Sequence, residues 1–188
     1  DLNDTRIIRD SNQGGINLDA QWSDDFHHAL HVILTGETGA HFRDFSEADS
    51  FRRAYSSRFV YDGRYSEFRK RTHGNSAKDI VSDKFVVFSQ NHDQVGNRRN
   101  GERLSSLVDL ESLKCAAAAV LLSPYIPLLF MGEEYGETNP FLYFVNHSDE
   151  NLKQAVRKGR RKEFSEFQGE EPPPDPFAEE TFQLSKID

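Results

Sequence analysis

A cluster of polar side chains follows directly on an apolar segment near the middle of the chain. Residues 85–89 have the branched and aromatic side chains of a strand buried on both faces, and Asn91, His92, Asp93 and Gln94 come straight after it. The carboxyl end of a parallel strand is where α/β folds bind ligands, so this carboxylate, imidazole and pair of amides could bind and polarise a substrate. In a plainer interpretation, Asp93 only caps the next turn and His92 lies in the core. The pair by itself leaves both interpretations open.

A second group of candidate residues lies near the start of residues 21–37, where the apolar spacing predicts a helix. Trp22 stands beside a polar turn, where its ring could stack on the face of a sugar or fill the core. Asp24 and Asp25 follow it and can cap the helix. The tryptophan is thus a candidate binding platform, with the core role as its alternative.

Three histidines in the same segment suggest a metal site at first sight. His27 and His31 are four residues apart, so they share one face of the predicted helix beside His28. No cysteine or third ligand stands at a convincing spacing, however. We therefore expect no metal and no cofactor.

The composition limits the classes of partner. The chain has 188 residues, 36% hydrophobic and 29% charged, as is ordinary for a soluble globular protein. Its net charge of −8 argues against nucleic acid and anionic membranes as partners, and it suits a neutral ligand such as a sugar. No segment approaches the roughly 18 apolar residues of a membrane span. The single cysteine, Cys115, excludes an internal disulfide and is expected to be buried, which fits a cytoplasmic location.

The order of the predicted elements indicates an α/β fold. Strands are predicted at 16–20, 85–89 and 128–131, helices at 21–37, 47–61 and 110–122, and loops at 64–83 and 94–107. Strands that alternate with helices in this way are typical of βαβ units around a parallel sheet. About three such units are expected.

The last part of the chain is more polar. Residues 150–167 predict a charged surface helix interrupted at Gly159, and we interpret its basic stretch 157–162 as solvated because acidic residues flank it. A Pro-rich segment then predicts a stiff, extended linker. We therefore expect one domain at 1–168 and a linker at 169–188.

Three tracts, in the same order along the chain, resemble one family. They are LDAQWSDDFHHALHVILTGE (18–37), NHDQVGNRRNGERL (91–104) and SPYIPLLFMGEEYGE (123–137). They are similar to the maltooligosyltrehalose trehalohydrolases, a family in the α-amylase superfamily of glycoside hydrolases, and the similarity extends over nearly the whole chain. A complete barrel of this superfamily usually takes about 250 residues. The resemblance therefore implies a partial (β/α)₈ TIM barrel, roughly the last three β/α units, lacking the first half and the C-terminal β-sandwich.

The resemblance also implies roles for the candidate residues. Retaining enzymes of this superfamily use an aspartate nucleophile, a glutamate acid/base and a second aspartate that stabilises the oxocarbenium-like transition state. Asp93 matches this second aspartate, and the nucleophile and the acid/base are expected upstream of Asp1. The residues expected to bind substrate are His92, Asn91, Gln94, Trp22 and Asp25, while Glu133 and Glu134 are expected to be structural.

The implied activity is the hydrolysis of the α-1,4 bond next to the trehalose end of maltooligosyltrehalose, which releases trehalose for trehalose biosynthesis. The ligand would be this or another α-glucan, and the isolated chain is expected to be inactive. Three alternatives stay open: a fragment of a glycogen branching enzyme, a non-catalytic carbohydrate-binding domain, and a half-barrel that self-associates through its open edges.

Overall fold

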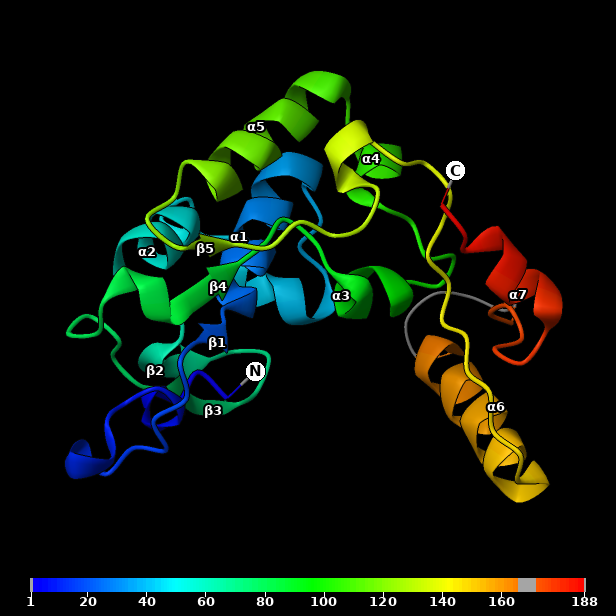
Figure 1. Ribbon diagram of the computed structural model, residues 1–188, viewed down its shortest axis with the longest axis horizontal. Coiled ribbons are helices and arrows are strands. Elements are labelled where there is room, and N and C mark those ends of the chain that lie inside the picture. Colours follow the sequence, from blue (N-terminus) through cyan, green and yellow to red (C-terminus); the bar gives the residue numbers. More distant parts are fainter. Residues whose placement is uncertain (1, 166–171, 188) are drawn as a thin grey trace. The chain divides into compact units, whose positions relative to one another are not determined.

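The computed structural model describes residues 2–165 and 172–187 (Figure 1). The chain forms two compact units, each built from two separate segments. Unit 1 comprises Asp1–Ser89 and Val108–Leu129, and unit 2 comprises Gln90–Leu107 and Phe130–Asp188. Within the described residues, no helix has both the length and the hydrophobicity that crossing a membrane requires.

Unit 1 contains a parallel sheet of three short strands, β1 (Gln21–Trp22), β4 (Phe85–Val87) and β5 (Ile126–Pro127), with β4 in the middle (Figure 1). Phe85 and Val87 are buried, as the apolar run predicted for a strand covered on both faces. The predicted α/β fold with a parallel sheet is confirmed.

Helices pack around this sheet. The α-helices of unit 1 are α1 (Asp24–Thr35), α2 (Ser50–Ser57) and α5 (Leu110–Leu121), and its short 3₁₀ helices are η1 (Thr5–Ile7), η2 (Ser11–Gln13), η3 (Ala40–Phe45) and η4 (Ser82–Lys84). Helix α1 buries Phe26, Ala29 and Leu30, which share one face at the expected helical spacing, and it ends at Gly36 with a φ of 73°. It packs against α2, α5 and β4. The three predicted helices are thus confirmed, α2 in a shorter form.

Aromatic rings join the helices to the central strand. Tyr125, just before β5, packs its ring against Phe26 of α1 and Phe85 of β4, with centroids 6.2 and 6.3 Å away. Its hydroxyl donates a hydrogen bond to the carbonyl of Tyr55 in α2 (2.6 Å). The contact orients each ring edge toward face, the arrangement that aromatic pairs favour.

The predicted outer strands are misplaced. Ile16–Ala20 forms no strand, because Ile16 and Leu18 are exposed and their N–H groups donate to carbonyls of η1. The strand comes directly after this segment, at β1. The strand predicted at 128–131 also lies earlier, at β5, although the N–H of Leu128 still donates to the carbonyl of Val87 (2.9 Å).

An antiparallel hairpin, β2 (Asp62–Ser66) and β3 (Arg71–Gly74), occupies the segment predicted as a loop. Asp44 of η3 fixes its turn: its carboxylate accepts hydrogen bonds from the hydroxyls of Ser66 (2.5 Å) and Tyr61 (2.6 Å) and from the N–H of Glu67 (3.0 Å). Burial acts to raise the pKa of Asp44, but these hydrogen bonds outweigh it and hold the pKa below its usual value. Cys115 in α5 is exposed, contrary to the prediction that it is buried.

Unit 2 contains the helices α3 (His92–Gly96), α4 (Leu104–Leu107), α6 (Glu150–Ser165) and α7 (Glu179–Leu184) and the 3₁₀ helix η5 (Glu133–Tyr135). Two short helices therefore replace much of the loop predicted at 94–107. Gly159 does not interrupt α6. The buried side chains of Val95, Leu104, Phe130, Leu142 and Phe164 form its apolar core.

The segment predicted as a linker, 169–188, is only partly described. Residues 169–171 and 188 lie outside the described residues. From residue 172 onward the chain includes α7. Ser185 follows this helix directly, and its hydroxyl accepts a hydrogen bond from the N–H of Leu142 (3.0 Å). The ring of Phe182 contacts that of Phe144, with centroids 5.2 Å apart. This part is packed within unit 2 and is not an extended linker.

We predict that unit 1 loses stability in mild acid because of His28. Its ring is enclosed by those of His27, His41 and Phe45, with centroids 5.2, 5.0 and 4.9 Å away. Burial, followed by repulsion from His27 and His41, lowers the pKa of His28 well below its usual value. The folded state thus resists a proton that the unfolded chain accepts. The contribution of the uncharged His28 to the free energy of unfolding is complete above about pH 6.5 and decreases as the pH falls below that value.

The measurement is urea unfolding between pH 7 and 4.5, followed by the fluorescence of Trp22, which lies in the same unit. His28→Phe should reduce the loss of unfolding free energy on acidification, because the replacement ring cannot be protonated. His147→Phe, in unit 2, is the matched control and should leave the dependence as it is. Equal slopes for both variants would contradict the assignment.

Candidate active site

The polar cluster predicted after the central strand forms the start of α3 in unit 2. The side-chain oxygen of Asn91 accepts hydrogen bonds from the N–H groups of Asp93 (2.8 Å) and Gln94 (3.3 Å). The backbone of Asn91 is extended, and its carbonyl accepts the first helical hydrogen bond, from Val95 (3.0 Å). This is the N-cap geometry that asparagine favours. The cap begins the helix immediately after the strand.

His92 and Asp93 both present exposed side chains, 57% and 66% respectively. His92 Nε2 lies 3.4 Å from Asp93 Oδ1, so the imidazole and the carboxylate are neighbours on one helical turn. The carboxylate can accept hydrogen bonds from ligand hydroxyls and can stabilise positive charge. The alternative in which His92 is a core histidine is wrong.

Asn91 and Gln94 differ in their exposure. Asn91 is 2% exposed, and its Nδ2 is a buried atom without a hydrogen-bond partner among the described residues. Gln94 is half-buried. Both were expected to shape a subsite, and that role stays a prediction. Gln90, which sequence reasoning missed, is buried, and its side-chain oxygen accepts a hydrogen bond from the N–H of Leu104 (2.9 Å). It ties the chain before the cap to the start of α4.

Trp22 lies in unit 1, at the end of β1. Its side chain is 40% exposed, and its ring contacts Phe88 edge-on, with centroids 5.4 Å apart. The ring is thus neither buried in the core nor fully solvated. A stacking role for the exposed part of the ring stays a prediction.

Asp25, also in unit 1, has the geometry of a structural residue. It is 2% exposed, and its Oδ2 accepts hydrogen bonds from the N–H groups of Val60 (2.7 Å) and Tyr61 (2.8 Å) and from the side chain of Asn3 (2.8 Å). Burial raises the pKa of Asp25, and the three hydrogen bonds oppose that rise. The contacts favour a structural role over the substrate-binding role that the resemblance implied, which remains untested.

The histidines of α1 form a packed cluster. His27 Nδ1 donates to the carbonyl of Ser89 (2.6 Å) at the end of the central strand, and His31 Nε2 meets the carboxylate of Glu37 at 2.9 Å. Among the residues that the structure describes, no group of three or more His, Cys, Asp or Glu side chains is arranged to hold a metal ion. His27 therefore acts on the strand that leads to the candidate site, a role that its sequence spacing did not suggest.

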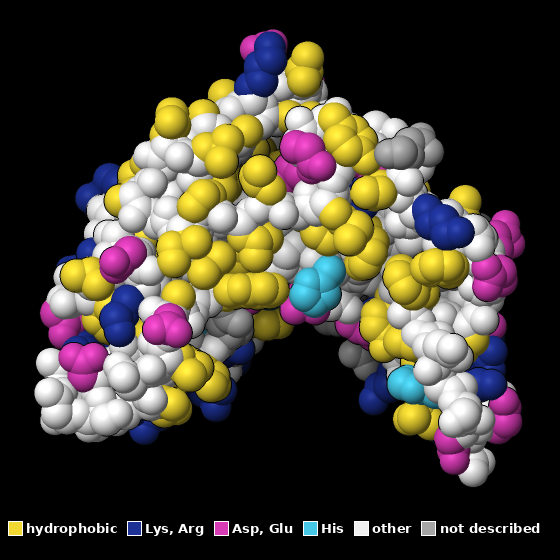
Figure 2. Space-filling model, viewed as in Figure 1, with side chains coloured by type: hydrophobic (Ala, Val, Ile, Leu, Met, Phe, Trp, Pro, Cys, Tyr) yellow, Lys and Arg dark blue, Asp and Glu magenta, His cyan; other side chains and the backbone are white. Residues whose placement is uncertain are grey.

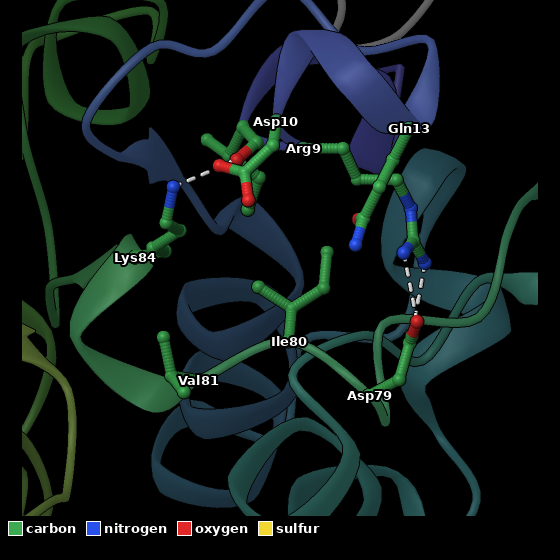
Figure 3. Close-up of a pocket in the computed structure, with 8 residues that line it drawn as sticks. Arg9, Asp10, Gln13, Asp79, Ile80, Val81 and Lys84 are labelled. Atoms are coloured by element: carbon green, nitrogen blue, oxygen red, sulfur yellow. Dashed lines mark hydrogen bonds and ion pairs between the residues drawn. The ribbon is translucent and has the colours of Figure 1, made fainter.

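A pocket of about 350 Å³ opens on unit 1 and is lined by Ile8, Arg9, Asp10, Gln13, Asp79, Ile80, Val81 and Lys84 (Figure 3). Its arginine is fully engaged with Asp79, at 2.7 and 2.9 Å, and Lys84 donates to the carbonyl of Ile8 (2.9 Å). None of the residues expected to bind substrate lines this pocket. Its charges are largely satisfied by the protein itself.

A buried arginine organises the loops of unit 2. Arg103 is 1% exposed and donates to the carbonyls of Asn139 and Met131, both at 2.7 Å. Its guanidinium lies over the ring of Phe130, 4.7 Å from the centroid. Glu133 accepts the N–H of Phe130 (3.0 Å), which is a structural contact of the kind expected for it. Sequence reasoning placed Arg103 in a loop and missed this role.

Comparison with known proteins bears on the implied family. No protein-family model matches the chain. Malto-oligosyltrehalose trehalohydrolases from Saccharolobus solfataricus and from Rhizobium sp. strain M-11 match 100% of it, at 54% identity over 187 residues and 44% over 192. The resemblance to the maltooligosyltrehalose trehalohydrolases is confirmed. The chain spans 32% of the length of each of these two relatives.

A solved structure agrees with the trehalohydrolase resemblance at the level of the superfamily. A crystal structure from Salmonella typhimurium, provisionally named an alpha amylase, matches 100% of the chain and has 46% sequence identity to it. The TM-score is 0.89, and the match covers 32% of that protein. The fold of the chain is therefore close to that of part of an alpha amylase relative.

We predict that Asp25→Ala destabilises unit 1 by about 1–3 kcal/mol, because it leaves buried N–H groups without an acceptor. Urea unfolding followed by Trp22 fluorescence measures the change. Asp19→Ala, at an exposed position, is the matched control and should have little effect. If Asp25 instead serves the trehalohydrolase substrate alone, the two variants will unfold alike.

The cap at α3 gives a second prediction. Asn91→Ala should destabilise unit 2 by about 1 kcal/mol, because the first turn of α3 loses its side-chain acceptor. Asn91→Ser keeps an oxygen at the capping position and should recover most of that loss. Far-UV circular dichroism during urea unfolding measures both. Equal losses in the two variants would show that the carboxamide does not act as a cap.

Proposed function

We propose that the chain is part of a retaining α-glycoside hydrolase that cleaves the α-1,4 bond beside the trehalose end of maltooligosyltrehalose and releases trehalose. The observation that carries this proposal is the 54% identity to a curated trehalohydrolase along the whole chain. The exposed His92 and Asp93 side chains support it, because a sugar needs accessible acceptors and donors at the point of cleavage.

Asp93 is proposed to stabilise the transition state. As the glycosidic bond breaks, positive charge builds on the sugar ring, and a carboxylate that accepts hydrogen bonds from ring hydroxyls strengthens its hold as that charge grows. His92 would hydrogen-bond the same sugar, Gln94 would line the neighbouring subsite, and Trp22 would stack on a glucose ring. Asn91 serves His92, Asp93 and Gln94 chiefly by capping α3, the helix that carries them.

The nucleophile and the acid/base are sought in the part of the relatives that this chain does not span. A retaining mechanism needs two further carboxyl groups about 5–5.5 Å apart across the anomeric carbon. We propose that the 188-residue chain alone is inactive. Incubated with maltooligosyltrehalose, it should release no trehalose above a blank without protein.

We propose further that the sheet of unit 1 is a segment of a (β/α)₈ barrel, roughly its last three β/α units. Among the described residues, β1 and β5 each pair with β4 alone, so each leaves one edge without a neighbouring strand. Hydrophobic side chains are also exposed over α5 and β5 (Figure 2), namely Leu110, Leu121, Leu122 and Ile126. Parallel sheets are normally covered on both faces, and in a barrel every strand has a neighbour on each side, so these surfaces support the proposal. Their use in self-association is the alternative, which light scattering of the chain distinguishes.

The decisive experiment uses the full-length protein that contains this chain. We predict that Asp93→Asn lowers the rate of trehalose release by at least about a hundredfold, because the amide cannot stabilise the developing positive charge. The measurement is the initial rate of trehalose formation from maltooligosyltrehalose. Asp109→Asn, at the N-cap of α5, is the matched control and should keep the rate close to that of the unmodified protein.

The products separate the alternatives. A branching enzyme would transfer glucan chains and release no trehalose. A carbohydrate-binding domain would bind maltooligosaccharides equally well after the Asp93 substitution. Trehalose release that survives Asp93→Asn unchanged would contradict the role proposed for this carboxylate.

A further inference from the structure

The basic stretch of α6 is not solvated throughout, contrary to the prediction. The side chain of Arg160 is only 11% exposed. Its guanidinium carbon lies 4.5 Å from the ring centroid of Tyr143 and 4.7 Å from that of Phe164. Rings at these distances attract the cation and restrict its motion. The next residue, Arg161, is exposed. Arg160 is therefore a packed side chain, and its neighbour is an ordinary surface residue.

The packed guanidinium is bound to the end of α3. Arg160 Nη2 donates to the carbonyl of Gly96, the last residue of the helix, at 3.2 Å. Its Nη1 donates to the side-chain oxygen of Asn97, the C-cap, at 3.0 Å and to the carboxylate of Glu163 at 3.2 Å. The last carbonyls of a helix lack partners within it, and a cation placed there is favourable. Arg160 thus holds the carboxyl end of α3 from a helix more than sixty residues later.

Helix α3 depends on such external contacts. It has five residues, and a helix of so few turns is not stable by itself. Asn91 caps its first turn and Arg160 holds its last residue, so its two ends are fixed by different parts of unit 2. Asp93 lies in the first turn. Any rotation or shift of the helix moves this carboxylate directly.

We propose that Arg160 is a positioning residue for glycoside cleavage: by holding Gly96 and Asn97 it sets where the carboxylate of Asp93 stands. This inference rests on the proposed function of Asp93. Arg160 acts through α3 and not through contact with the sugar. The cost of its loss should therefore appear in the chemical step more than in substrate binding.

The test compares Arg160→Ala with Arg161→Ala in the full-length protein. Arg160→Ala should lower kcat roughly tenfold to a hundredfold, because small displacements of a reacting geometry cost that much, while KM changes less. Arg161→Ala should leave both constants close to those of the unmodified protein. Arg160→Lys should recover part of the loss, because a single ammonium can reach one acceptor but lacks the planar fork that reaches both. Equal kcat values for the two alanine variants would overturn the inference.

Two further readouts separate positioning from a general structural role. In the Asp93→Asn background, Arg160→Ala should change the residual rate by less than about twofold, because the group that it positions is already absent. A loss as large as in the unmodified background would overturn the inference. Hydrogen exchange of the amides at 92–97 should be faster in Arg160→Ala than in Arg161→Ala, whatever the activity, and unchanged exchange would likewise overturn it. If the unmodified full-length protein releases no trehalose, the proposed function fails, and the exchange result still decides whether Arg160 holds α3.

Discussion

The two hydrogen bonds that the Asn91 side chain accepts are the interaction on which the candidate site depends. They begin α3 within a few residues of a strand whose side chains are almost wholly buried. Without an acceptor there, the first N–H groups of α3 would lack a hydrogen-bond partner, and a helix starting at that point would be less stable. Because the helix starts at His92, the side chains of His92 and Asp93 are exposed to solvent and are not buried in the core. The residues before the cap support the same turn. His27 binds the carbonyl of Ser89, and the side chain of Gln90 binds the N–H of Leu104.

The elements that sequence reasoning placed well are those with a strong apolar pattern of their own. The central strand at Phe85 and the helices α1 and α5 carry continuous or periodic apolar residues, so burial alone determines them. The outer strands β1 and β5 have two residues each, and they exist because they pair with β4. Their positions depend on register with a strand forty or more residues away in the sequence, which no local pattern records. Ile16 and Leu18 resembled a strand in composition, yet both are exposed and their N–H groups donate to carbonyls of η1.

Charged residues were the other source of error, because their partners lie far along the chain. Arg160 was predicted to be solvated and Arg103 was placed in a loop, whereas in the structure the guanidinium of each lies against an aromatic ring and donates to backbone carbonyls. The hairpin of β2 and β3 was missed for the same reason. Its residues are mostly polar, and its turn is ordered by Asp44, which lies some twenty residues earlier. A charged side chain that is buried in this way can be recognised only when its hydrogen-bond partners and the aromatic rings around it are known.

Asp25 and Asp93 show that the local sequence around an aspartate does not determine its role. Each aspartate lies in the first turn of a helix that follows a strand of the parallel sheet, and local sequence treats the two alike. Their surroundings decide otherwise. Three N–H donors, from Asn3, Val60 and Tyr61, converge on the Asp25 carboxylate and bury it, so its hydrogen-bonding capacity is used within the fold. The N–H of Asp93 donates to the side chain of Asn91 and its carbonyl accepts from the N–H of Asn97, while its carboxylate stays exposed beside His92. The carboxylate of Asp93 is therefore accessible to a ligand, whereas that of Asp25 is enclosed, and the residues that make this difference lie far from either aspartate in the sequence.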